Sequence, residues 1–117
     1  MSTDSILLEK SMELAIRIVR MCQYLETEKR ELVMSKQVLR SGTSVGANVR
    51  EGIYGQSRKD FISKLSIALK ETVETEYWID LLFRTEYLTE KQYEGIREDV
   101  SAVAKMLTAT LRRTKGE

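Results

Sequence analysis

The sequence predicts an all-α fold, an up-down-up-down antiparallel four-helix bundle built by a single domain over residues 1–117. Three observations support this prediction. Pro, which breaks helix interiors, is absent from all 117 residues. Apolar residues recur at spacings of three and four in four long segments, as they do on one face of a helix. The links between these segments are short, so neighbouring helices are expected to run antiparallel.

The first helix is predicted over about residues 5–26. Its core face consists of residues spaced three or four apart: Leu7, Ser11, Leu14, Ile18, Cys22 and Leu25. A short charged link at about residues 27–31 follows, and its brevity returns the chain alongside the first helix.

The second helix is predicted over about residues 31–54, although four glycines lie between Gly42 and Gly55. Each glycine disfavours a helix interior by about 1 kcal/mol relative to alanine, so a Gly-rich loop is the alternative. The apolar spacing nevertheless continues through Val49, and no Gly-Lys-Ser/Thr phosphate-loop signature is present. We therefore expect a helix whose Gly42-x-x-x-Gly46 segment allows another helix to approach closely. Its core face is Val38, Gly42, Val45, Val49 and Gly52.

The third and fourth helices are predicted over about residues 57–86 and 89–113. Ser57 with Asp60 resembles a capping box, and Thr89 with Gln92 forms a good one. The third helix has the core face Phe61, Leu65, Ala68, Thr72, Thr75, Ile79 and Leu82. The fourth has Tyr93, Ile96, Val100, Val103, Leu107 and Leu111.

Charge is unevenly distributed although the net charge is only +1. Residues 35–70 hold seven basic and two acidic groups, residues 71–99 hold three and nine, and residues 100–117 hold four and one. This pattern indicates a phosphate-binding surface, and a solvated helix surface is the alternative. The predicted nucleic-acid contacts are Arg40, Arg50, Arg58, Lys59, Arg112 and Arg113.

The composition excludes most enzyme chemistry. His is absent and Cys occurs once, so there is no imidazole base, no Cys–His pair and no thiolate zinc site. Carboxylates at Glu71, Glu74 and Asp80 are compatible with a Mg²⁺ site, but a charge-balanced helix surface explains them better. We therefore predict no catalytic residue, no metal and no cofactor.

Two helices carry a second stripe beside their core face, which predicts an oligomer. The stripe of the second helix is small and polar, and that of the third contains Trp78, a frequent interface anchor. The alternative is that Trp78 packs inside its own bundle. The predicted interface residues are Ser41, Ser44, Asn48, Glu51, Gly52, Ile67, Glu71 and Trp78.

No membrane segment or secretory signal is predicted. The longest uncharged run, residues 41–49, is far shorter than the ~20 residues of a membrane span. The single Cys22 fits a reducing compartment. We therefore expect a cytoplasmic protein.

Two runs of the sequence resemble a known family. Residues 37–55 read Gln-Val-Leu-Arg-Ser-Gly-Thr-Ser-Val-Gly-Ala-Asn-Val-Arg-Glu-Gly-Ile-Tyr-Gly. This run is similar to the signature of the bacterial four-helix-bundle proteins encoded in intervening sequences of 23S ribosomal RNA genes, with Ser44, Asn48, Glu51 and Gly52 matching. Residues 60–79 resemble the second block of that family. Many members read Arg-Gly-Ser where this chain reads Leu-Lys-Glu at residues 69–71.

The resemblance implies an up-down four-helix bundle that assembles as a ring-like homopentamer, with a link to RNA and no enzymatic activity. The accessory protein of diversity-generating retroelements is similar in fold, and it binds nucleic acid through a basic surface. The expected function is therefore a homo-oligomeric scaffold that binds RNA. The alternative is a protein–protein adaptor with no nucleic-acid role.

Overall fold

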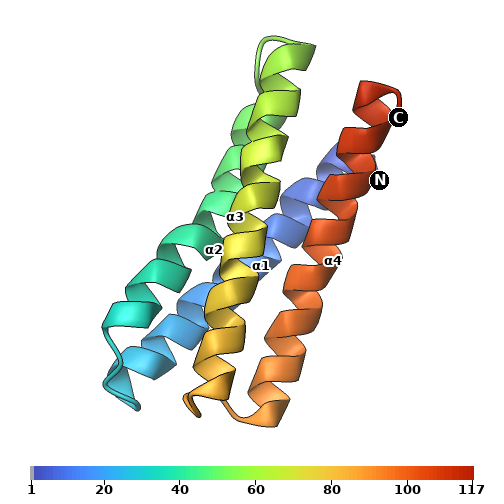
Figure 1. Ribbon diagram of the computed structural model, residues 1–117. Coiled ribbons are helices and arrows are strands. Elements are labelled where there is room, and N and C mark those ends of the chain that lie inside the picture. The colour runs from blue at the N-terminus through green and yellow to red at the C-terminus, as the bar shows by residue number, and fades with distance from the viewer. Residues whose placement is uncertain (1) are drawn as a thin grey trace.

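The computed structural model describes residues 2–117, which form four helices and no strand (Figure 1). The helices are α1 (Thr3–Thr27), α2 (Val33–Ile53), α3 (Arg58–Arg84) and α4 (Glu90–Lys115). They alternate in direction, as the up-down prediction requires. Each end lies within two residues of its predicted position, so the all-α fold is confirmed.

The starts of α3 and α4 are capped by the residues that the sequence indicated. The Ser57 hydroxyl accepts a hydrogen bond of 3.0 Å from the backbone N–H of Asp60. Thr89 and Gln92 satisfy one another's backbone N–H groups in a capping box. These bonds use donors that have no partner within the first helical turn.

Helix α2 begins in a different way from the one expected. Glu31, predicted as its first residue, lies just outside it and is 8% exposed. Its carboxylate accepts from the backbone N–H groups of Val33, Met34 and Ser35 at 3.1, 3.0 and 2.8 Å. A single glutamate therefore satisfies three unpaired donors of the first turn, the task that Ser or Asp usually performs.

The predicted core faces point into the molecule. All six predicted residues of α1 are buried, as are the five of α2, while Phe61 of α3 and Tyr93 of α4 are half-buried at the ends of their stripes. The remaining predicted residues of α3 and α4 are buried. The prediction of the core residues from helical spacing is therefore confirmed except at Phe61 and Tyr93.

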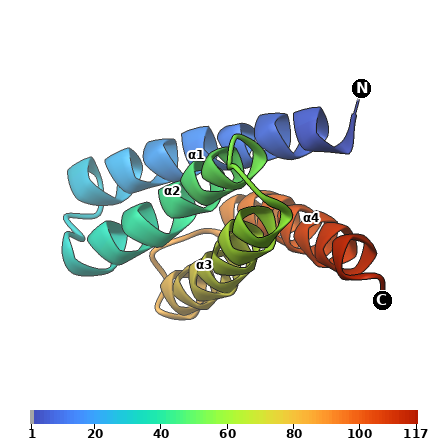
Figure 2. The same ribbon diagram turned by 90° about the horizontal axis from the view of Figure 1, so that it is seen from above.

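The helices form an elongated body of 44 × 23 × 21 Å in which each helix packs against its neighbours in the chain. Helix α2 lies between α1 and α3, and α4 closes the bundle by contacting α3 and α1 (Figure 2). Within residues 2–117, α1 and α3 make no close backbone approach, and neither do α2 and α4.

The glycines of α2 allow close helix packing, as predicted. A Cβ on Gly42 would lie 2.8 Å from Cγ1 of Ile18, and one on Gly46 would lie 3.3 Å from the carbonyl oxygen of Ser11. Both neighbours belong to α1. These glycines lower the intrinsic helix propensity of α2, but only a residue without a Cβ allows α1 to pack this closely on α2.

Candidate functional site

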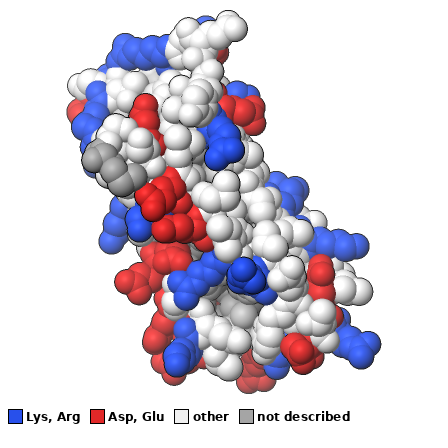
Figure 3. Space-filling view, turned by 180° about the vertical axis from the view of Figure 1, so that it is seen from behind, with Lys and Arg blue, Asp and Glu red and all other residues white. Residues whose placement is uncertain are grey.

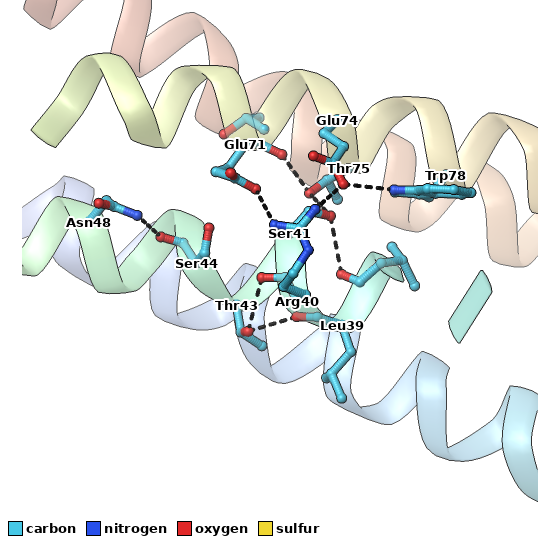
Figure 4. Close-up of polar contacts among 12 residues, drawn as sticks. Leu39, Arg40, Ser41, Thr43, Ser44, Asn48, Glu71, Glu74, Thr75 and Trp78 are labelled. Carbon is cyan, nitrogen blue, oxygen red and sulfur yellow. Dashed lines mark hydrogen bonds and ion pairs between the residues drawn. The ribbon is translucent and has the colours of Figure 1, made fainter. Parts of the chain in front are cut away.

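The second stripes of α2 and α3 face each other across one polar seam (Figure 4). Arg40 of α2 reaches over to α3, where its Nη1 lies 3.2 Å from Oε2 of Glu71 and its Nη2 pairs with Glu74. The indole N–H of Trp78 donates to the same Glu74 carboxylate at 3.0 Å. Deeper in the seam, the hydroxyls of Thr75 and Ser41 lie 2.9 Å apart.

These contacts favour the charged forms of both Glu74 and Arg40. The hydrogen bond from Trp78, followed by that from Arg40, lowers the pKa of Glu74 below its ordinary value. The hydrogen bond to Glu74 raises the pKa of Arg40. The Arg40 side chain is 51% exposed and that of Glu74 is 36% exposed. Solvent therefore screens the pair, which positions the helices more than it stabilises them.

Most of the predicted interface residues have partners in their own chain. Ser41 and Gly52 are buried between α2 and α3, so within the single chain they contact α3 and do not lie on an outer face. Glu71 pairs with Arg40, and Glu51 lies 3.4 Å from Lys64. The second stripe of α2 consists of small residues because α3 packs closely on it.

The other predicted interface residues differ in solvent exposure. Trp78 is half-buried and packs against the hydrophobic core, which was the alternative left open for it. The side-chain amide of Asn48 donates to the Ser44 carbonyl at 2.8 Å, and the buried Ser44 hydroxyl is the one such group without a partner among residues 2–117. Ile67 is 39% exposed.

Five of the six predicted nucleic-acid contacts gather at one end of the bundle. Arg50 lies in the last turn of α2, Arg58 and Lys59 in the first turn of α3, and Arg112 and Arg113 in the last turn of α4. These three helix ends share the top of Figure 1. The Arg58 guanidinium donates to the Thr114 carbonyl, which ties α3 to α4. We call the five residues, together with Lys115, the basic end.

Arg40 does not belong to the basic end. It lies about midway along α2, where two carboxylates of α3 neutralise it. Arg40 therefore lies apart from the other five predicted contacts and is paired within its own chain. The charge count along the chain could not reveal this ion pair, because its partners lie more than 30 residues away in sequence.

A hollow of about 510 Å³ opens beside the basic end, at the turn from α2 to α3. Tyr54, which ends α2, is 75% exposed in this hollow. The residues that line the hollow are Arg50, Glu51, Tyr54, Gly55, Gln56, Asp60 and Lys64. The hollow therefore combines an exposed aromatic ring with side chains of both charges.

An uncovered apolar surface along α1 and α2 was not predicted. Met12, Ile16 and Val19 of α1 are 45%, 48% and 37% exposed. The surface also includes Leu8, Ala15, Thr43, Gly46 and Ala47, which line the same grooves. Figure 3 shows it as a pale band flanked by charge. The positions 8, 12, 15, 16 and 19 follow helical spacing, so a search for a second stripe on α1 could have found it.

We call this surface the apolar band. A contiguous exposed apolar patch on a small protein usually marks an interaction site. Val73 and Tyr77, which are 57% and 58% exposed and lie one turn apart, form a second, separate apolar ridge on α3.

Metal-ligating and nucleophilic side chains are sparse in the described residues. Residues 2–117 hold no group of three or more side chains placed to share a metal ion. Burial raises the pKa of the Cys22 thiol to about 12, so this cysteine is no thiolate nucleophile at neutral pH. None of the helices described for residues 2–117 combines the length and hydropathy needed to cross a bilayer.

Comparison with known proteins places this fold and its motifs in a family. The sequence model described as 23S rRNA-intervening sequence protein matches residues 3–109. The chain belongs to this family. The 23S rRNA-intervening sequence resemblance of residues 37–55 is thereby confirmed, and α2 is the helix that carries that motif.

A solved structure of the same family is similar over nearly its whole length. It is a protein of unknown function from the S23 ribosomal protein family of Bacteroides thetaiotaomicron VPI-5482. The two chains are 53% identical, with 95% of this chain and 99% of the other covered and a TM-score of 0.93. No curated protein matches this chain.

Proposed function

We propose that this member of the 23S rRNA-intervening sequence family is a non-enzymatic, homopentameric helical scaffold that binds RNA through its basic end. The apolar band is the observation that carries the proposal. It leaves Met12, Ile16 and Val19 exposed on a chain that already buries an apolar core, which favours a second protein surface as its cover.

A second copy of the chain provides a suitable cover. The apolar band on α1 and α2 and the ridge on α3 are different surfaces. A contact between two different surfaces repeats from copy to copy and forms a ring when its rotation closes. The number five comes from the family resemblance. Ile67, a predicted interface residue that is 39% exposed, adds apolar surface on a neighbouring face of α3.

The basic end supports an RNA role. Six Lys and Arg side chains from three helices meet there, and all six are exposed. Such a cluster gains affinity for nucleic acid by releasing counterions from phosphates. The family description also names 23S rRNA. A cytoplasmic location, supported by the single unpaired Cys22, completes the proposal.

A protein–protein adaptor is the second candidate. The net charge of +1 gives the chain no overall attraction to polyanions. In this case the ridge on α3 would contact a partner protein and the basic end would remain a solvated surface.

Native mass spectrometry of the purified chain at low ionic strength tests the scaffold. A species of five times 13.5 kDa supports the pentamer, and a monomer overturns it. Titration with a single-stranded RNA then separates the two candidates. We expect affinity to fall with salt at a logarithmic slope of about −0.7 per phosphate contact. An absence of RNA binding at low salt leaves the adaptor.

A further inference from the structure

The hollow beside the basic end has a composition that a simple phosphate site would not have. Two cations, Arg50 and Lys64, line it together with two carboxylates, Glu51 and Asp60. The carboxylates cancel the cations, so an isolated anion gains little there. Six of its seven lining residues are exposed, so a ligand there would lie on an open surface.

Tyr54 places an exposed aromatic ring in the hollow, on which a planar ligand can stack. The residue ends α2, and three quarters of its surface is open to solvent. The other four tyrosines are less open: Tyr77 is 58% exposed and Tyr24, Tyr87 and Tyr93 pack partly against the core. Aromatic side chains in this position, among cations, stack unpaired bases in single-stranded nucleic-acid sites.

We propose that this hollow binds an unpaired guanine nucleotide, with Tyr54 stacking on the base, a carboxylate accepting from its edge and Arg50 contacting its phosphate. The inference rests on the proposed RNA function and names the feature of RNA that is recognised. Guanine presents two adjacent donors, N1–H and the 2-amino group, which match the two oxygens of one carboxylate. Adenine, cytosine and uracil each place an acceptor beside their donor.

Glu51 is the better placed of the two carboxylates. It lies one turn before Tyr54 on α2, and its side chain is 59% exposed. The ammonium of Lys64 lies 3.4 Å from its carboxylate, which holds the carboxylate beside the hollow without covering it. The same lysine is then available to a phosphate when the base takes the carboxylate.

Fluorescence anisotropy with labelled eight-nucleotide RNAs tests the inference. One RNA carries a single central guanine, a second has adenine in its place, and a hairpin stem presents the guanine paired. We expect the first RNA to bind most tightly. Tyr54→Ala should weaken that binding about 5- to 150-fold, the range measured when a stacking side chain is removed.

Matched variants separate stacking from general loss of surface. Tyr54→Phe keeps the ring and should retain affinity, whereas Tyr54→Leu keeps the apolar bulk and should lose it. Glu51→Gln should abolish the preference for guanine over adenine. Competition with free GMP distinguishes a free nucleotide from a base within RNA. Displacement of the labelled RNA by GMP indicates a site for the nucleotide itself. If GMP does not displace an RNA that still binds with guanine preference, the base is recognised only within RNA.

Two results would overturn the inference in distinguishable ways. Equal binding by Tyr54→Ala and the unaltered chain would refute the stacking site while leaving RNA binding at the basic end. No binding of any RNA or of GMP by the unaltered chain would refute the proposed RNA function and this site together.

Discussion

Glu74 accepts hydrogen bonds from two helices at once, from Trp78 on its own helix α3 and from Arg40 on α2. Both donors favour the ionised carboxylate, so its pKa is lowered. Because the folded pKa lies below the unfolded value, this contribution to stability is present above the unfolded pKa and is lost as the pH falls through the folded one. The seam is therefore sensitive to acid.

We predict that the fluorescence of Trp78, the single tryptophan of the chain, titrates with a midpoint below the ordinary glutamate value of 4.5. Protonation of Glu74 removes the acceptor of the indole N–H, which changes the surroundings of the ring. Glu74→Gln should eliminate the transition, and Arg40→Ala should raise its midpoint. A midpoint at or above 4.5 in the unaltered chain would contradict the assignment.

Helix α2 exists because its glycines fit its neighbours. Gly42 contacts Ile18 of α1, and a Cβ on Gly52 would lie 2.8 Å from Cδ1 of Leu65 on α3. Propensity alone disfavours this helix, and packing on both sides reverses that preference.

Gly42→Ala should therefore lower the free energy of unfolding by about 1–3 kcal/mol, although alanine is the better helix former. The new methyl would meet the β-branched Ile18, whose rotamers are restricted. Gly95→Ala on α4 is the matched control. Its methyl would meet only the far end of the flexible Arg17 side chain, which is half-exposed and paired with Asp99 and can shift, so stability should stay equal or rise. Urea unfolding of both variants measures the difference.

The extent of the helices followed from the sequence because spacing and capping are local. Ser57 and Thr89 act as caps with partners three residues away. The cap by Glu31 was missed because it depends on how a buried side chain folds back over the turn. The α2–α3 seam was missed as well, since two half-polar stripes predict an interface without saying whether the partner helix belongs to the same chain.

At the scale of the whole molecule, the up-down order explains the basic end. Antiparallel packing brings the end of α2, the start of α3 and the end of α4 together, so five of the predicted contacts converge. That convergence could be predicted from the sequence. The apolar band could not be found by counting one face per helix, because α1 is apolar on a second face too.

We predict that Ile16→Glu dissociates the oligomer while leaving the fold intact. Ile16 is 48% exposed in the middle of the apolar band, so a charge there costs the single chain little but is desolvated at an interface. Native mass spectrometry should show a 13.5 kDa species. Val33→Glu, an equivalent change at a residue 76% exposed and outside the band, should keep the assembly. Persistence of the oligomer in Ile16→Glu would mean that another surface holds it.

The pairing of helices in chain order also has a kinetic consequence. Three of the four helix contacts join helices that are consecutive in sequence, and only the contact of α1 with α4 brings distant parts of the chain together. Short loops make the consecutive hairpins inexpensive in chain entropy. Such local topology is typical of proteins that fold within microseconds to milliseconds, and the docking of α4 on α1 is expected to complete the reaction.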